Sequence, residues 1–336
     1  MTRELNTEPL ISIIIPCYNY AHFLNDCFIN LSEQSHTNWE CLIIDNNSTD
    51  NTKQVVLDFI EKDKRFSYHF QPIKGPSAAR NLGIELAKGD FIQFLDADDL
   101  LALHKFKNAL SIFAMNNELD IVYSGMRYFP NENPSEYYYS MRLDKSTDKE
   151  WMCYAQGGME AMLPHLLKEN IMVISSPLIK ASSLKEIGLF DTSLAYNEDW
   201  ELWLRFAFAN KQFAVDKDAN SFALIRVHKT SHSNNAFKMF LAGIKIGFRY
   251  ENKISNLNLK KQFQHKTDYA IFSLERILFQ RKKDEKYLTE VMPLLVDVVP
   301  FPRFIKWNNL INHNKWRVLR INIIINYIFR YLKFKV

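Results

Sequence analysis

Short apolar runs, separated by stretches with helical spacing, constrain the fold of this chain more than any other feature. The runs lie at residues 10–15 (LISIII), 39–44 (WECLII), 66–70, 90–95, 121–124 and 172–179. Continuous apolar runs of this length are typical of strands buried on both faces of a sheet. The stretches with helical spacing lie at residues 52–62, 78–88, 103–116 and 199–210. This alternation predicts an α/β fold with a mostly parallel sheet and helices on both of its faces.

Polar side chains follow three of these predicted strands at the points where the strands end. Tyr18 and Asn19 follow the first run, Asp45 follows the second, and Asp96 and Asp98 follow the fourth. In a parallel sheet the carboxyl ends of the strands meet at one edge, which is where ligands bind. We therefore expect these side chains to lie together on one rim.

Charge and cysteine usage exclude several classes of protein. The formal net charge is +4, but every charged residue after Asp297 is basic, so the tail carries +8 and residues 1–297 carry −4. A mildly acidic body argues against a protein that coats nucleic acid. The four cysteines include no CxxC pair, which disfavours a zinc site or a disulfide framework. Residues 1–9 lack the apolar core of a signal peptide, so we expect a cytoplasmic protein.

The acidic cluster Asp96-Ala97-Asp98-Asp99 has two interpretations. Carboxylates at a strand end are often solvated turn residues. They are also the ligands that Mg²⁺ and Mn²⁺ prefer, and Mg²⁺ usually takes one or two of them and completes its shell with phosphate oxygens. Because the preceding run FIQFL is strongly apolar, the cluster follows a buried strand, which favours the metal interpretation.

Several longer blocks resemble one known family, in the order and spacing of that family. They are SIIIPCYNY, ECLIIDNNSTDNT, GPSAARNLGIELAKGDFIQFLDADD, GLFDTSLAYNEDWELWLRFA and IRVHKTSHS. These blocks cover roughly residues 10–230 and resemble family 2 glycosyltransferases with the GT-A fold, which is a Rossmann-like, mostly parallel sheet flanked by helices. The resemblance implies a metal-dependent hexosyltransferase that uses a nucleotide-diphosphate sugar and a divalent metal (Mn²⁺ or Mg²⁺) and inverts the anomeric carbon.

The first two blocks supply the nucleoside end of the donor site in this resemblance. Pro16, Cys17 and Tyr18 match the segment that lines the nucleoside, with Tyr18 against the base. Asp45 matches the acidic residue that binds the nucleoside. The commonest family pattern has a second acidic residue next, where this chain has Asn46, so uracil, guanine and thymine all stay open as the base.

The third block supplies the phosphate and metal end. Lys74 and Arg80 precede the acidic cluster, and both are assigned to donor binding; Arg80 either reaches the nucleotide or orders the metal loop, and a surface salt bridge is the alternative for Lys74. Asp96 and Asp98 match the two acidic positions of the DxD motif. The resemblance assigns Asp96 to the donor and Asp98 to the metal, with Asp99 as an outer partner.

The last two blocks supply the catalytic base and a further metal ligand. Asp199 matches the family's base, which removes the acceptor proton on the face of the sugar opposite the leaving group. The alternative is that Glu198 and Asp199 only favour a helix start through the helix dipole. In some members of the family, the basic residue of the Arg-x-His element contacts the diphosphate and the histidine completes the metal shell, and Arg226 and His228 match these positions. The alternative for His228 is a structural or surface histidine.

The domain organisation follows from the extent of these blocks. We expect a GT-A catalytic domain at 1–232, divided into a nucleotide-sugar part (1–125) and an acceptor part (126–232), followed by a basic helical region at 233–336. The polar positions of 315–336 form one helical stripe, which fits either packing against protein or peripheral contact with the inner face of the cell membrane.

The expected acceptor is a saccharide or a lipid-linked saccharide used in polysaccharide or glycolipid synthesis. Two other functions stay open, a nucleotide-sugar binding module without activity and a nucleotidyltransferase. The second usually needs a glycine-rich phosphate loop, and neither GxGxxG nor GxxxxGK[ST] occurs in this sequence.

Overall fold

The computed structural model describes residues 8–228, 235–281, 284, 286, 287, 290 and 294. The chain divides into two compact units, residues 1–231 and 232–336. The helical stripe expected at 315–336 lies outside the described residues, and so does any membrane contact it makes. Within the described ranges, no helix combines the length and the hydropathy that crossing a membrane requires.

The first unit alternates strands and helices from its start. Its strands are β1 (Ile11–Cys17), β2 (Trp39–Asp45), β3 (Phe66–Phe70), β4 (Phe91–Phe94), β5 (Leu100–Leu101), β6 (Ile121–Pro130), β7 (Pro177–Lys180), β8 (Phe213–Asp216) and β9 (Phe222–Val227). Its helices are α1 (Ala21–Ser32), α2 (Thr52–Ile60), α3 (Pro76–Leu86), α4 (Lys105–Met115), α5 (Met159–Leu166), α6 (Ala181–Ile187) and α7 (Glu198–Phe208).

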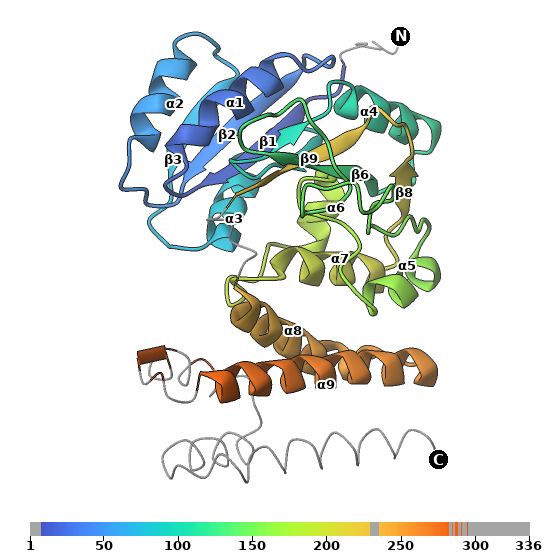
Figure 1. Ribbon diagram of the computed structural model, residues 1–336. Coiled ribbons are helices and arrows are strands. Elements are labelled where there is room, and N and C mark those ends of the chain that lie inside the picture. The colour runs from blue at the N-terminus through green and yellow to red at the C-terminus, as the bar shows by residue number, and fades with distance from the viewer. Residues whose placement is uncertain are drawn as a thin grey trace. The chain divides into compact units, whose positions relative to one another are not determined.

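These strands form one curled sheet in the order β3-β2-β1-β4-β7-β6-β9-β5, and β8 also pairs with β6. Neighbours from β3 to β4 are parallel, whereas β7 is antiparallel to both β4 and β6. Figure 1 shows α1 and α2 on one face of the sheet and α3 on the other. The predicted α/β fold with a mostly parallel sheet and helices on both faces is therefore confirmed.

Strand β1 lies at the centre of the first four strands and is buried because nearly every residue in it is apolar. The side chains of Ile11, Ile13, Ile14 and Ile15 have no exposed surface. Helix α3 approaches β1 closely at Gly83, where an added Cβ would lie 2.3 Å from Cγ2 of Ile14. A glycine is needed there because any side chain would push the helix off the strand.

The strand predicted at 172–179 is wrong in its first half. Strand β7 begins only at Pro177, and the backbone N–H of Ser176 donates to the carbonyl of Val173 in a turn. This turn points the Ser175 hydroxyl inward, where it donates to Asp99 at 3.1 Å. A buried polar contact has replaced sheet pairing at this position.

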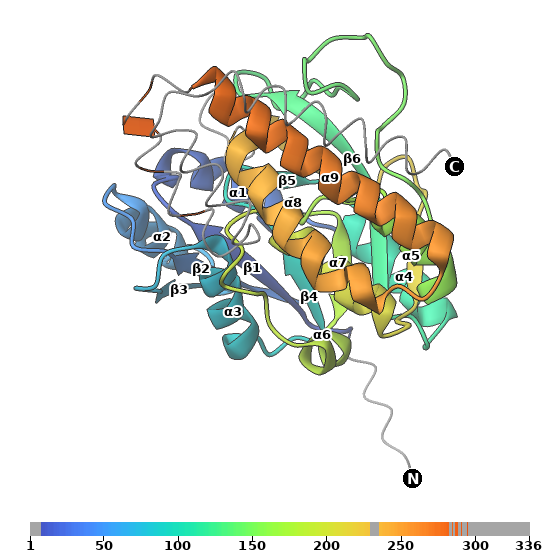
Figure 2. The same ribbon diagram turned by 90° about the horizontal axis from the view of Figure 1, so that it is seen from below.

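The second unit is helical where it is described, in agreement with the predicted helical C-terminal region. Helix α8 (Ala236–Tyr250) packs against α9 (Leu257–Gln280), and Figure 2 shows the two side by side. The two helices lie close together at Gly247, where an added Cβ would lie 2.2 Å from the Thr267 hydroxyl oxygen.

Candidate active site

The rim predicted from the sequence exists in the structure. Strands β2, β1 and β4 are neighbours and parallel, so their carboxyl ends meet at one edge of the sheet. Cys17 pairs in register with Asp45, and Asp96 follows the last residue of β4 by two positions. The strand ends therefore bring together side chains that lie up to about eighty residues apart in the sequence.

At the β1 end of this rim, Tyr18 presents its ring to solvent. Its side chain is half exposed, and the Lys74 ammonium lies 5.8 Å from the ring centroid. Cys17 is buried instead, with its sulfur 3.8 Å from the Thr52 hydroxyl, and burial raises the pKa of the thiol to about 12. Pro16 lies within β1 and pairs with Ile44, so the turn that the sequence allows at Pro16 is not formed. The Cys17 side chain stays neutral and buried, while Tyr18 and Lys74 are exposed.

Asp45 is fixed in place at the end of β2. Its carboxylate is buried and accepts hydrogen bonds from the Ser48 backbone N–H at 2.8 Å and from the Tyr68 hydroxyl at 2.7 Å. Burial, and then the bond to Asp45, raise the pKa of Tyr68 above its ordinary value, so its proton stays in place as a donor. Tyr68, on β3, has no counterpart among the residues predicted from sequence motifs.

The three carboxylates of the acidic cluster point to three different partners. Asp99 points into the protein, where it accepts from the Ser175 hydroxyl and from the backbone N–H of Arg226, both at 3.1 Å. Burial and the neighbouring charges of Asp98 and Asp96 raise the pKa of Asp99 well above its ordinary value. Asp99 therefore anchors the loop to β9 and to the turn before β7.

Arg226 is the second anchor of this loop. Its side chain is only 1% exposed and lies between the rings of Phe23 and Phe129, at 4.9 and 4.7 Å from their centroids. Its guanidinium contacts the carbonyl of Asp98 (2.8 Å), the carboxylate of Asp26 (3.0 Å) and the amide oxygen of Asn131 (3.3 Å). The contact with the diphosphate assigned to Arg226 stays a prediction, and the contacts in this structure are those of a residue that holds the loop.

Asp98 and His228 come together as the sequence predicts, although 130 positions separate them. Asp98 Oδ2 lies 2.7 Å from His228 Nε2, and the two side chains are 13% and 8% exposed. Two adjacent ligands of an octahedral ion with bonds near 2.1 Å lie roughly 3 Å apart, so this pair has a spacing close to that of a metal site.

The described residues contain no group of three or more His, Cys, Asp or Glu side chains arranged to hold a metal ion. A carboxylate and an imidazole nevertheless fit a divalent ion that takes its other ligands from phosphate oxygens and water. That donor set is the one expected where the metal binds together with a nucleotide.

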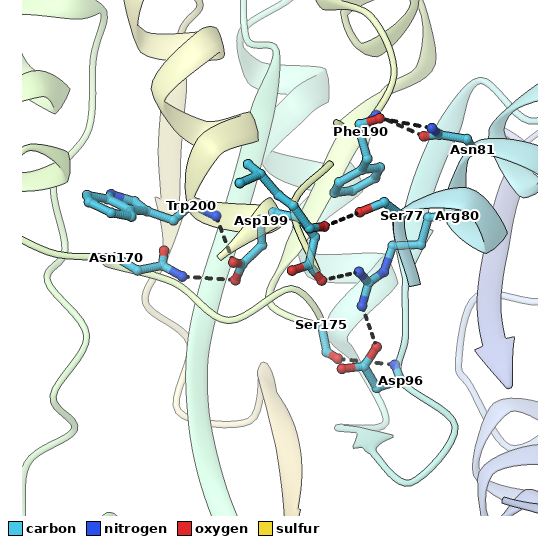
Figure 3. A network of polar contacts seen from close by, with 11 residues as sticks. Ser77, Arg80, Asn81, Asp96, Asn170, Ser175, Phe190, Asp199 and Trp200 are labelled. Atoms are coloured by element: carbon cyan, nitrogen blue, oxygen red, sulfur yellow. Dashed lines mark hydrogen bonds and ion pairs between the residues drawn. The ribbon is translucent and has the colours of Figure 1, made fainter. Parts of the chain in front are cut away.

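Arg80 links the acidic loop to the start of helix α7, as Figure 3 shows. One of its terminal nitrogens lies 2.8 Å from Asp96 Oδ1, and the other lies 2.6 Å from Glu198 Oε1. The Arg80 side chain is 4% exposed, so these two carboxylates balance a buried positive charge. Loss of either one leaves a buried charge without a partner, which is costly.

Asp199 lies next to this link, at the start of α7. Its Oδ2 accepts from the side-chain amide of Asn170 at 2.9 Å, and its Oδ1 accepts from the Trp200 backbone N–H at 2.7 Å (Figure 3). Burial, and then the charge of Glu198, raise the pKa of Asp199 to about 7. A carboxylate with this pKa is half deprotonated at neutral pH, in the range suited to a general base.

Asn170 and Ser175 are two contacts of the site that sequence reasoning missed. Both belong to the segment NIMVISSP, in which polar residues flank the short apolar run IMVI on both sides. Polar residues directly beside a buried run are the available signal, because a buried polar side chain needs a partner inside the protein.

With this geometry in view, the class of the protein is defined by comparison with known proteins. Residues 12–176 match the family model described as Glycosyl transferase family 2. A protein of Haemophilus influenzae, described as an uncharacterized glycosyltransferase, is 32% identical over 247 residues, which cover 72% of this chain and 89% of that protein. The chain therefore belongs to glycosyltransferase family 2.

A relative with a more specific name matches a shorter segment. It is the UDP-Glc:alpha-D-GlcNAc-diphosphoundecaprenol beta-1,3-glucosyltransferase WfgD of Escherichia coli, which is 36% identical over 108 residues. The match covers 32% of this chain and 42% of WfgD.

Solved structures confirm the GT-A fold. Staphylococcus aureus TarS 1–349 in complex with UDP-GlcNAc superposes with a TM-score of 0.61 at 17% identity, covering 86% of this chain and 81% of TarS 1–349. The mannosyltransferase PcManGT of Pyrobaculum calidifontis, in complex with GDP-Man and Mn²⁺, superposes with a TM-score of 0.57 at 15% identity, covering 94% and 87% of the two chains.

Proposed function

We propose that this glycosyltransferase moves a hexose from a nucleotide-diphosphate sugar to a hydroxyl group of a saccharide or lipid-linked acceptor, with inversion at the anomeric carbon. One observation carries the proposal. A continuous set of contacts, from Asp96 through Arg80 to Glu198, fixes the acidic loop relative to the helix that bears Asp199. A donor site and a base are thereby held in a fixed relation, which a displacement reaction requires.

On the donor side, the nucleoside lies across the ends of β1 and β2, with its base against Tyr18 and near Lys74. Asp98 and His228 would hold a divalent metal, Mn²⁺ or Mg²⁺, which would neutralise negative charge on the diphosphate leaving group. Asp99 and Arg226 keep Asp98 in position through the backbone contacts described above. The UDP-GlcNAc and GDP-Man complexes of the structural neighbours support a nucleotide-sugar donor.

On the acceptor side, Asp199 removes the proton of the attacking hydroxyl group. Its raised pKa lets it accept this proton near neutral pH. The hydrogen bond from the Asn170 amide to Oδ2 holds the carboxylate in one orientation. Attack from the side opposite the diphosphate inverts the anomeric carbon. General-base catalysis of this kind typically contributes about 10²–10⁴ in rate.

We further propose that residues 1–232 form the catalytic domain and that residues 126–232 contribute the acceptor part. The name of WfgD, which describes a diphosphoundecaprenol-linked acceptor, supports a lipid-linked saccharide as the acceptor. An enzyme acting on such a substrate works at the inner face of the cell membrane, and the basic stripe at 315–336 is the proposed peripheral contact.

The test begins with a donor screen in the presence of Mn²⁺, by thermal shift and then by release of the nucleoside diphosphate. Asp98→Ala and Asp199→Asn are each expected to abolish transfer, whereas Asp199→Asn retains donor binding. Unimpaired turnover in Asp199→Asn removes that residue from the role of base. Binding of nucleotide without donor consumption, across a broad acceptor panel, contradicts the assignment as an enzyme.

A further inference from the structure

Asn46 occupies the position where the commonest family pattern has a second acidic residue, and the structure shows what its amide does. The residue is buried, with 6% of its surface exposed, directly after β2. Its side-chain nitrogen donates to the carbonyl of Ile73 at 2.6 Å, and its side-chain oxygen accepts from the backbone N–H of Gly75, also at 2.6 Å. The amide therefore holds the middle and the last residue of one short segment.

This segment, residues 71–75, connects β3 to α3 and is called the β3–α3 loop below. It begins where the Gln71 backbone N–H donates to the carbonyl of Asp45 at 2.8 Å, and it ends at Gly75, whose φ is +128°. Between these points it carries Ile73, with 65% of its surface exposed, and Lys74, whose ammonium faces the ring of Tyr18. The loop thus lies beside the tyrosine that is proposed to contact the nucleobase.

An amide can make both of these bonds at neutral pH, whereas an ionised carboxylate cannot. A carboxylate has acceptor oxygens alone, so an aspartate at position 46 accepts from Gly75 but repels the Ile73 carbonyl. The chain therefore uses the chemistry of asparagine, and not merely its size, to fix the loop.

We propose that Asn46 is a positioning residue that fixes the β3–α3 loop as a wall of the nucleobase subsite, so that this residue sets affinity for the base of the donor. The inference rests on the proposed function, because it takes a nucleoside diphosphate as the ligand. It assigns to Asn46 a contact with the loop and not with the nucleotide itself.

The test compares Asn46→Asp with the wild type by titration calorimetry in Mn²⁺, using UDP, GDP, dTDP and inorganic pyrophosphate as probes. Loss of one buried hydrogen bond, plus repulsion of a carbonyl, is expected to weaken binding of the preferred nucleotide about tenfold or more. Affinity for pyrophosphate, which has no base, is expected to stay within about twofold. Parallel weakening of both probes means that the substitution acts on the whole site, and it overturns the inference.

A second test repeats the nucleotide titrations at acid pH. A buried aspartate facing a carbonyl has a raised pKa, and once protonated it can again donate to Ile73. The ratio of nucleotide dissociation constants between Asn46→Asp and wild type is therefore expected to shrink from pH 7.5 to pH 5, whereas the ratio for Asn46→Ala stays constant. A constant ratio for both variants contradicts the proposed hydrogen-bond mechanism.

Gly75→Ala tests the same loop without altering a buried residue. An added Cβ at Gly75 meets no atom within 4 Å, so the variant is expected to fold, but φ near +128° is unfavourable for alanine and displaces the loop. It is expected to weaken nucleotide but not pyrophosphate binding. If wild type binds none of the three nucleotides, the proposed function fails together with this inference; if it binds one and both variants bind that nucleotide equally well, only the inference fails.

Discussion

Removing the amide of Asn170 is expected to change the pH dependence of catalysis in a direction that the structure specifies. This amide donates to Asp199 Oδ2 at 2.9 Å and so stabilises the ionised form of the carboxylate, whose pKa is about 7. Without it, the ionised form is less stable, and the pKa of Asp199 rises further. Asn170→Ala is therefore expected to shift the acid limb of the activity profile to higher pH.

The size of the shift follows from the strength of the bond. A hydrogen bond to a charged group is worth about 1.5–3 kcal/mol, which corresponds to roughly one to two pH units. Asn170 is half-buried, so water partly replaces it, and we expect a shift of about one unit. At pH 7 the ionised fraction then falls from about one half to about one tenth, a roughly fivefold loss of kcat/KM, while the plateau at high pH is retained.

The assay measures kcat/KM for release of nucleoside diphosphate, with the donor found in the screen at concentrations well below its KM, from pH 5.5 to pH 9.5. Asn38→Ala is the control, because its amide donates to the backbone carbonyl of Glu8 and contacts no carboxylate of the site. The control profile is expected to coincide with that of the wild type. A profile for Asn170→Ala that coincides with the wild type, or that moves to lower pH, refutes the reasoning.

Three further predictions concern the buried charges and the metal. Arg80→Lys is expected to lower the free energy of unfolding by about 3 kcal/mol, measured by urea denaturation, because one ammonium cannot span both Asp96 and Glu198; an unchanged midpoint contradicts this. Burial lowers the pKa of Lys105 to about 7, so this group makes the wild type more stable as pH rises above 7, by about 2 kcal/mol between pH 7 and pH 9. The free energy of unfolding of Lys105→Met, measured by urea denaturation, is expected not to show this rise between pH 7 and pH 9. An equal pH dependence in the two proteins shows that Lys105 does not titrate in this range. EDTA is expected to abolish calorimetric binding of the nucleotide, and excess Mn²⁺ to restore it; binding that survives the chelator argues against the metal.

Much of the fold follows from the sequence because burial on both faces of a parallel sheet demands uninterrupted apolar runs. The runs at 10–15 and 39–44 correspond closely to β1 and β2. The strand expected at 172–176 is absent, because the apolar run MVI resembles a strand whereas the chain forms a turn there and the Ser175 hydroxyl donates to Asp99. The pattern of apolar residues in the sequence shows which segments are buried, but it does not show which distant group a buried serine will bind.

The site shows the same division. The juxtaposition of Asp98 and His228 was predicted from motifs, and the structure brings the two side chains together. The sequence motifs do not predict the surroundings of Arg226. Its guanidinium contacts Asp26 in α1 and Asn131 after β6, and no motif connects these residues to it. The pKa of Asp199 likewise depends on burial, a property of the folded chain.

The position of Arg80 has a consequence for substitutions elsewhere in the unit. Arg80 belongs to α3, which packs on β1 and β2. Through its ion pair with Glu198, Arg80 fixes the start of α7 relative to these two strands. The segments between β6 and α7 take no part in this ion-pair bridge. Substitutions in these segments therefore leave the bridge from Asp96 through Arg80 to Glu198 intact, provided that they spare Asn170 and Ser175, which contact Asp199 and Asp99.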